Sequence, residues 1–429
     1  MKQFALIYVL LITFFTLFIP VSGFALNEWT VIVYLCGDDN KDASLEENHR
    51  KDLEEMARAS SKPGLEVVVQ ADRGTKISEY LKQAYADPSY SGAKRYVVKN
   101  SSWETEAQLG EINTGSPYAL WDMLKWVAAK HPAKHYCLII NGHGSGIYSW
   151  RGEGNVSAAV PGAVNFDPNR FVAYDSTDDD CLTVFEVQAV LEAFRARLNS
   201  GRKVDLIGFD ACMAGMIEAL YQLKESCQVM VANPSLTPGT GFDYDGIVSA
   251  LGRNLAMTPE QLAEVITKTF IDSVHSNTDP QMLSAWRTDR VQELVFALNN
   301  LSMEMLKAIK LTGKKAGLSN MTTYGGSNLY WDIERILRAV QDRNTNWNGA
   351  SNAQVIVNLA AEAQAALKAA RVSMWYDGSF SANKVGGLSI AWPDPDKYKS
   401  YRNFYKALAF SKTTKWDEFL DARELNISE

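Results

Sequence analysis

The chain has 429 residues, of which 46% are hydrophobic and 22% are charged, as is typical of a globular protein with one large core or two ordinary ones. Its formal net charge of −7 argues against a nucleic-acid partner, and no dense run of lysine and arginine contradicts this. The composition therefore favours a folded enzyme or binding protein whose partners are not nucleic acids.

The amino terminus has the pattern of an export signal. Lys2 precedes an apolar run over 4–20, and the small-residue pattern Val-Ser-Gly follows at 21–23. This order predicts a signal peptide over residues 1–23 and an exported protein, whether secreted, periplasmic or at the cell surface. A membrane anchor is the alternative, because the run approaches spanning length. No later stretch is as long, so we expect no stable membrane insertion of the mature chain.

From residue 24 to about 288, strand patterns alternate with helix patterns. The strand patterns, rich in Val, Ile and Tyr, cover 29–36, 65–71, 95–99, 136–141, 204–209 and 228–232. The helix patterns, with apolar residues every three or four positions, cover 45–59, 118–129, 184–198, 214–223 and 259–274. Such alternation predicts an α/β domain with a mostly parallel sheet that helices cover on both faces.

The pattern changes in residues 289–429. Helices are predicted over 291–309, 332–340 and 353–370, and a late strand over 387–392 is stopped by Pro393. We expect a mainly helical region whose late strand returns to the main sheet, rather than a second domain that folds independently.

Two motifs run from a predicted strand into a reactive side chain. His143 lies in an Asn-Gly-His-Gly motif after the strand at 136–141, and Cys212 ends an Asp-Ala-Cys motif after the strand at 204–209. Parallel neighbours in a doubly wound sheet end at the same edge, which is where such folds place their sites. Alone, each motif is more typical of a turn histidine or a core cysteine. Together they predict a hydrolase with a thiol nucleophile and an imidazole as its proton partner.

The five cysteines leave at least one free thiol if the protein is exported, because their number is odd. They are Cys36, Cys137, Cys181, Cys212 and Cys227. Only Cys212 has the setting of a reactive thiolate, because a helix predicted to start near Ala214 would direct its positive end at the sulfur. The backbone amides of Gly144 and Cys212 are candidate oxyanion donors.

Acidic residues near these motifs have two interpretations each. Asp210 lies two positions before Cys212, so it could form an acidic floor for a basic substrate side chain, or it could cap a helix or pair with a nearby base. Asp38, Asp39 and Asn40 follow the first strand, where their oxygens could hold a hard cation such as calcium. A solvated turn and helix cap is the commoner role of such a cluster. No zinc-type spacing appears, and the sequence alone commits to no metal site.

The connection between the two motifs, residues 144–182, is rich in Gly, Ser, Pro, Asn and Asp. Long irregular connections in compact domains are usually functional or mobile. We expect this one to lie over the site or to be cleaved.

These residues resemble the clostripain family of cysteine peptidases, which shares a clan with caspases, gingipains, legumain and separase. The two motifs look like the family's catalytic pair, and residues 29–40 look like its first strand and Asp-Asn turn. Residues 387–393, an aromatic-rich helix and Trp416 look like its closing region. The resemblance spans most of the mature chain.

The resemblance implies a caspase-like three-layer sandwich over 24–288, with Cys212 as nucleophile and His143 as its partner. Substrates would be exposed polypeptides, cut after Arg or Lys. Family zymogens are often matured by cleavage between the two motifs, and Arg151 and Arg170 are basic cleavage points there. Calcium activates some members and not others, so the resemblance requires no cofactor and leaves calcium open.

One stretch departs from the family pattern. Similar proteins often carry an acidic residue in the Pro-Gly-x-Gly stretch downstream of the nucleophile, where this chain has Thr240, with Asp243 as the nearest acidic substitute. The departure weakens a strict Arg or Lys preference and leaves the Cys–His chemistry untouched. An inactive exported binding protein on a peptidase scaffold and a thiol-dependent acyl or amide transferase are the alternative functions.

Overall fold

The computed structural model describes residues 26–39, 44–59, 62–74, 91–147, 171–274, 281–313, 318, 321–324, 329–342, 349–377, 380 and 385–422. The predicted signal peptide, residues 1–23, lies outside these ranges. Within them, no helix is both long enough and apolar enough to cross a membrane.

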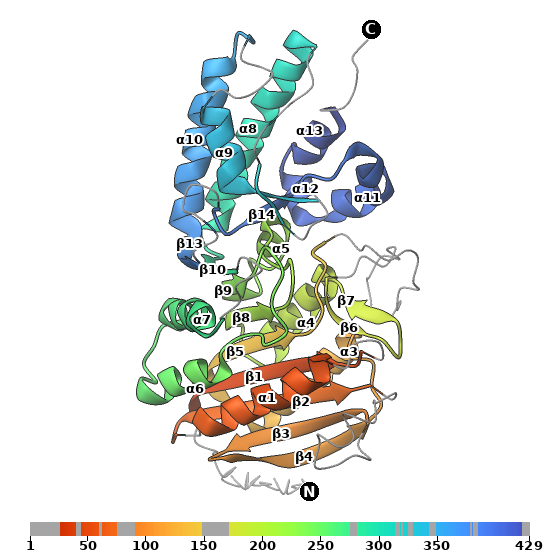
Figure 1. The fold of residues 1–429 in the computed structure, drawn as a ribbon, viewed down its shortest axis with the longest axis vertical. Helices are drawn as coiled ribbons and strands as arrows, with labels where there is room; N and C mark the ends of the chain where they lie inside the picture. The colour runs from red at the N-terminus through yellow and green to blue at the C-terminus, as the bar shows by residue number, and fades with distance from the viewer. Residues whose placement is uncertain are drawn as a thin grey trace, which may run out of the picture.

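A nine-stranded sheet forms the centre of the α/β part (Figure 1). Its strands are β1 (Asn27–Gly37), β2 (Leu65–Arg73), β3 (Ala93–Lys99), β4 (Ser102–Gly110), β5 (Ala133–Asn141), β8 (Val204–Asp210), β9 (Cys227–Ala232), β10 (Met282–Arg287) and β13 (Arg371–Tyr376). Their order is β13-β10-β9-β8-β5-β1-β2-β3-β4. The five central strands pair in parallel, whereas the two strands at each edge pair antiparallel. The predicted mostly parallel sheet is confirmed.

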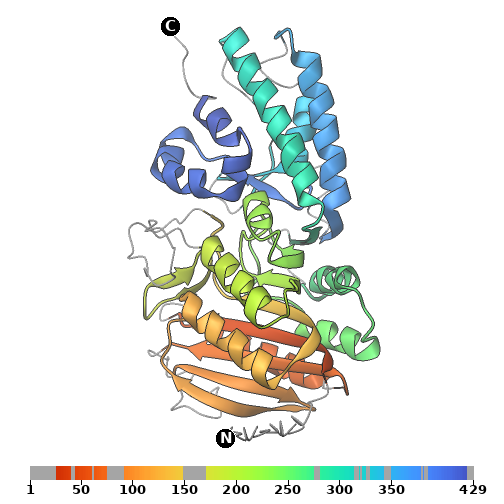
Figure 2. The same cartoon turned by 180° about the vertical axis from the view of Figure 1, so that it is seen from behind.

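Helices cover both faces of this sheet, which gives three layers (Figures 1 and 2). The helices on one face are α1 (Ser44–Ala59), α6 (Tyr244–Arg253) and α7 (Pro259–Ser273), and those on the other are α3 (Pro117–Lys130), α4 (Val184–Arg197) and α5 (Ile217–Gln222). Successive strand residues enter different cores, as Val31 and Ile32 do on either side of β1. Because both faces are buried, the central strands read as continuous apolar runs.

The carboxyl-terminal region is mainly helical, as predicted. Its helices are α8 (Val291–Thr312), α9 (Ile333–Gln341), α10 (Ala353–Ala370), α11 (Pro395–Ala407), α12 (Ala409–Thr413) and α13 (Trp416–Ala422). They lie beyond one edge of the large sheet, at the top of Figure 1.

The prediction that the late strand returns to the main sheet is wrong. That strand, β14 (Ser389–Ala391), pairs with β12 (Tyr330–Asp332) in a small sheet completed by β11 (Thr323–Tyr324). The strand of this region that joins the main sheet is β13, which pairs with β10. It follows α10 without an intervening residue, so no turn signal marks its start.

Part of the segment predicted as an irregular connection is regular. Strands β6 (Val172–Asp175) and β7 (Asp180–Leu182) form an antiparallel hairpin. Residues 148–170, which include the candidate cleavage points Arg151 and Arg170, lie outside the described ranges.

Candidate active site

The two motifs leave the sheet side by side. Strands β5 and β8 are parallel neighbours, and the register places Asn141 opposite Asp210. Beyond the strand ends, Gly144 lies against the backbone of Cys212 so closely that a Cβ added to it would lie 2.3 Å from the Cys212 carbonyl oxygen. Only glycine fits such an approach. The expectation that His143 and Cys212 share one edge of one sheet is therefore met.

Cys212 lies in a tight turn rather than at the start of a helix. Helix α5 begins only at Ile217, so the prediction that its positive end stabilises a thiolate is wrong. Burial raises the pKa of the Cys212 thiol, and the hydrogen bond that the Thr237 N–H donates to Sγ, 3.3 Å long, opposes this. Met213, the next residue, has a left-handed backbone with φ of +56°, held by its N–H bond to the Ser235 carbonyl at 2.7 Å.

The other four cysteines are buried, whereas Cys212 is half-buried, and all five thiols are free. Burial raises the pKa values of Cys36, Cys137 and Cys227, the last to about 12. A thiol that is buried in apolar surroundings is unreactive. Cys212 is thus the only one of the five thiols that solvent and a substrate can reach.

His143 has an acidic partner that sequence reasoning missed. Its Nε2 lies 2.7 Å from Oδ2 of Asp39, the second residue after β1. The His143 side chain is 42% exposed and that of Asp39 only 9%. Since β1 is the other parallel neighbour of β5, its end lies at the same edge of the sheet. That shared edge was the signal that could have paired the two residues.

A buried hydrogen-bond network lies beneath the two motifs. Oδ2 of Asp210 accepts from the Asn141 amide at 2.8 Å, the Phe242 N–H at 2.9 Å and the Tyr244 hydroxyl at 3.0 Å. The Asn141 carbonyl oxygen accepts in turn from Nε2 of the buried His49 at 2.7 Å. Burial raises the pKa of Asp210 to about 6, against the effect of these three neutral donors. Among the described residues, the donors to the Asp210 carboxylate are these three neutral groups and not a lysine or arginine.

The other candidate specificity residues lie on the turn that covers Asp210. Gly241 has a φ of +60°, and a Cβ there would lie 2.4 Å from Oδ2 of Asp210. The neighbouring Thr240 is exposed. Asp243 is the N-cap of α6, because its Oδ1 accepts the Gly246 N–H at 2.9 Å.

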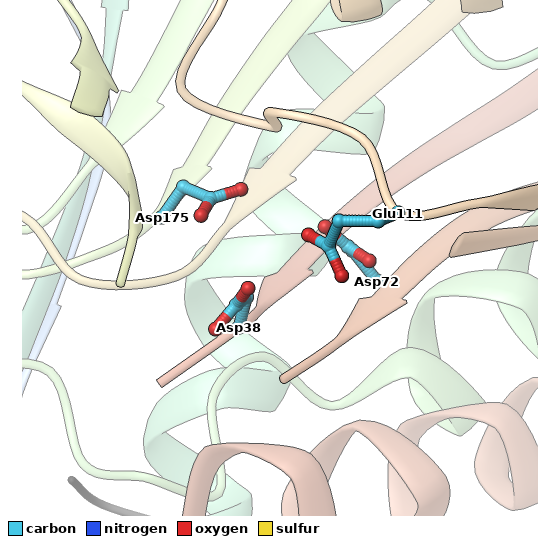
Figure 3. A group of neighbouring side chains, drawn as sticks. All are labelled: Asp38, Asp72, Glu111 and Asp175. Atoms are coloured by element: carbon cyan, nitrogen blue, oxygen red, sulfur yellow. The ribbon is translucent and has the colours of Figure 1, made fainter. Parts of the chain in front are cut away.

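The predicted cation ligands after β1 do not form one set. Asp38 belongs to a group of four carboxylates with Asp72, Glu111 and Asp175 (Figure 3), whereas Asp39 holds His143. Asn40 lies outside the described residues. Two adjacent aspartates thus serve two different clusters.

The carboxyl-terminal region supports the segment that follows Cys212. The Ser389 N–H donates to the Gly215 carbonyl at 2.9 Å. Oε1 of the fully buried Glu218 accepts from the Ala391 N–H and the Tyr405 hydroxyl, both at 2.9 Å. Burial raises the pKa of Glu218 to about 7. The region beyond residue 289 therefore helps to fix the nucleophile's turn.

Comparison with known proteins agrees with this arrangement. The model of the clostripain family, Peptidase C11, matches residues 33–422. Clostripain of Hathewaya histolytica is 26% identical in an alignment of 321 residues that covers 65% of this chain and 57% of that protein. The chain thus spans little more than half of that relative's length. The chain belongs to the clostripain family of cysteine peptidases.

Two solved structures share the fold. A secreted C11 cysteine protease from Bacteroides thetaiotaomicron, in complex with an irreversible peptide inhibitor, is 18% identical with a TM-score of 0.64. An inactive zymogen C11 protease from Parabacteroides distasonis is 15% identical with a TM-score of 0.62. Each comparison covers 91% of this chain and 99% of the other. The α/β fold and the helical carboxyl-terminal region are thus those of C11 proteases.

Proposed function

We propose that the chain is an exported cysteine endopeptidase in which Cys212 is the nucleophile and His143 its proton partner. The carrying observation is that both residues follow adjacent parallel strands and leave the sheet at one edge. Family membership supplies the reaction class, and the accessibility of Cys212 among five free thiols supports its choice as nucleophile.

The proposed reaction has two halves. The Cys212 sulfur attacks the scissile carbonyl carbon, the C–N bond breaks, and His143 gives its proton to the leaving amine, which leaves a thioester. His143 then takes a proton from water as the water oxygen attacks the thioester. The carboxylic acid product leaves, and the sulfur recovers a proton. Since burial raises the pKa of the Cys212 thiol, the thiolate depends on an imidazolium partner.

The residues around the dyad have positioning roles in this proposal. Asp39 occupies Nε2 of His143, which leaves Nδ1 for proton exchange with the sulfur and the substrate. The Gly144 and Cys212 amides are proposed to stabilise the oxyanion. Their chain neighbours cannot do so, because the Ser145 N–H bonds the Phe171 carbonyl and the Met213 N–H bonds the Ser235 carbonyl.

The proposed specificity is for a basic P1 side chain. Oδ2 of Asp210 already has three donors, but the buried Oδ1 has no hydrogen-bond partner within the described residues and can accept from a guanidinium or ammonium group. Thr240 lies at the rim of the covering turn without a charge. Asp243 is engaged as a helix cap, so we assign the preference to Asp210.

Export and maturation are also proposals. A signal peptide over 1–23 agrees with the description of the Bacteroides relative as a secreted protease. Maturation by cleavage at Arg151 or Arg170 agrees with the description of the Parabacteroides relative as an inactive zymogen.

The test is peptide cleavage by residues 24–429 on a library with mixed P1 residues. We expect cleavage after Arg and Lys, loss of cleavage in Cys212→Ala, and retention in Cys181→Ala, which removes a buried thiol instead. A folded chain that cleaves nothing, before or after trypsin treatment, would support the inactive binding protein. Amide products that form in preference to hydrolysis when an amine is added would support the transferase.

A further inference from the structure

Four carboxylates converge beside the proposed catalytic edge. Asp38 follows β1, Asp72 is near the end of β2, Glu111 follows β4, and Asp175 ends β6. One oxygen of each lies within 4.8 Å of the corresponding oxygens of the others (Figure 3). The topology of the sheet explains why these residues lie together. Strand β3 is antiparallel to both β2 and β4, and β1 is parallel to β2, so β1, β2 and β4 end at the same edge of the sheet.

Burial makes this grouping costly unless something compensates the charge. Asp38, Asp72 and Asp175 have no exposed surface, whereas Glu111 is exposed. Charged groups in such surroundings are normally paired or bound to a metal. Burial and mutual repulsion raise the pKa of Asp72 to about 9. Partial desolvation and the neighbouring carboxylates Asp38 and Asp175 raise the pKa of Glu111 to about 7. The nearby Arg73 pairs with Glu46, whose Oε2 lies 3.4 Å from the Arg73 Nε.

The hydrogen bonds of the buried members leave a carboxylate oxygen with no donor among the described residues. Asp175 is held by the N–H groups of Thr114, Thr177 and Asp178 and by the Thr114 hydroxyl. Asp72 is different: its Oδ1 accepts the Arg73 N–H at 2.9 Å, but its fully buried Oδ2 has no hydrogen-bond partner within the described residues. Asp72 belongs to the group in Figure 3, and its Oδ2 can accept a cation.

We propose that Asp38, Asp72, Glu111 and Asp175 bind one calcium ion. Calcium takes six to eight oxygen ligands at about 2.3–2.6 Å in flexible geometry, which suits four carboxylates from four chain segments. Oxygens on opposite sides of such an ion lie about 4.6–5.2 Å apart, so the 4.8 Å spacing fits one ion. Magnesium needs shorter bonds and a near-ideal octahedron. The exposed Glu111 gives the ion access from solvent.

The proposed ion would act on the site through one peptide bond. Asp38 is a ligand, and the next residue, Asp39, holds the imidazole of His143. Binding would therefore fix the turn from which Asp39 reaches that ring. This effect rests on the proposed peptidase function, whereas the binding of calcium does not.

Binding is tested on residues 24–429 with Cys212→Ala, so that self-cleavage and activity play no part. After treatment with a chelator, calcium chloride and magnesium chloride are titrated separately by calorimetry, and thermal unfolding is measured in each. We expect one calcium per chain, weaker binding of magnesium, and a rise in Tm of about 3–5 °C at a calcium concentration 100-fold above Kd.

Asp72→Asn should raise the Kd for calcium at least about ten-fold, because affinity follows the number of charged ligands. Asp178→Asn, which neutralises an exposed acid beside the group, should change the Kd for calcium less than three-fold. If Asp72→Asn does not fold, Glu111→Gln replaces it, since Glu111 is exposed. The proposal is overturned if the parent binds no calcium, if neither ligand variant weakens binding, or if Asp178→Asn weakens it equally.

Discussion

Replacement of Asp39 by alanine tests whether this carboxylate orients His143. Hydrogen bonds to charged groups contribute about 1.5–3 kcal/mol, and each 1.36 kcal/mol in the barrier is about a factor of ten in rate. Loss of the 2.7 Å bond should therefore lower kcat about 10- to 150-fold. Since the His143 side chain is 42% exposed, solvent weakens the interaction and favours the lower half of that range.

The assay is steady-state cleavage of an arginyl peptide by the processed enzyme. We expect kcat to fall in Asp39→Ala with KM within about two-fold, because Asp39 contacts the imidazole and not the substrate. Asp39→Asn keeps a neutral hydrogen bond, so its kcat should lie between that of the wild type and that of Asp39→Ala. Asp289→Ala removes an exposed carboxylate paired with Arg287 and should behave as wild type. If Asp39→Ala matches this control, or changes KM alone, Asp39 does not orient the ring.

Three further variants test the specificity and the support of the site. Asp210→Asn should lower kcat/KM for arginyl peptides at least about ten-fold more than for alanyl peptides, because a charge-assisted bond is lost; equal losses would mean a structural role only. Thr240→Asp should raise the preference for arginyl over alanyl peptides several-fold, and an unchanged ratio would remove this residue from the specificity site. The pKa of Glu218 is about 7 in the folded protein, whereas the usual value for a glutamate is 4.5. Between pH 4.5 and pH 7 the folded state therefore binds more protons than the unfolded state, so the stability falls as the pH rises. The free energy of unfolding should therefore fall by about 3 kcal/mol less between pH 4.5 and pH 7 in Glu218→Gln than in the wild type, as measured by urea titration. If both proteins show the same pH dependence, the pKa of Glu218 is not raised in the folded state.

The central strands could be predicted because they are buried on both faces. The strands around β1 read as apolar runs, whereas the edge strand β4 alternates between exposed and half-buried residues and is mostly polar in sequence. Nothing in its pattern predicts a strand, because its pairing with β3 comes from the tertiary fold. Helix α5 starts three residues later than predicted, because Ala214 to Met216 are small or apolar and fit a helix pattern. The positive φ of Met213, which places a turn before them, has no signal in the sequence.

The candidate site could be predicted in part. The sequence predicts His143 and Cys212 because each lies two residues beyond the end of a strand, and parallel neighbours end at the same edge of a sheet. Asp39 and Asp72 could not be assigned in this way, because each has an ordinary turn role when only its neighbours in sequence are considered. The partner of Asp39 is His143, which lies 104 positions away in the sequence. The partners of Asp72 lie on three other chain segments.

The most direct test of the proposed dyad is covalent labelling with a thiol-directed, arginine-based peptidyl inhibitor, followed by mass spectrometry. We expect one label per chain, on Cys212, with labelling greatly slowed in His143→Ala. A label on Cys36, Cys137, Cys181 or Cys227, or peptide cleavage that persists in Cys212→Ala, would contradict it.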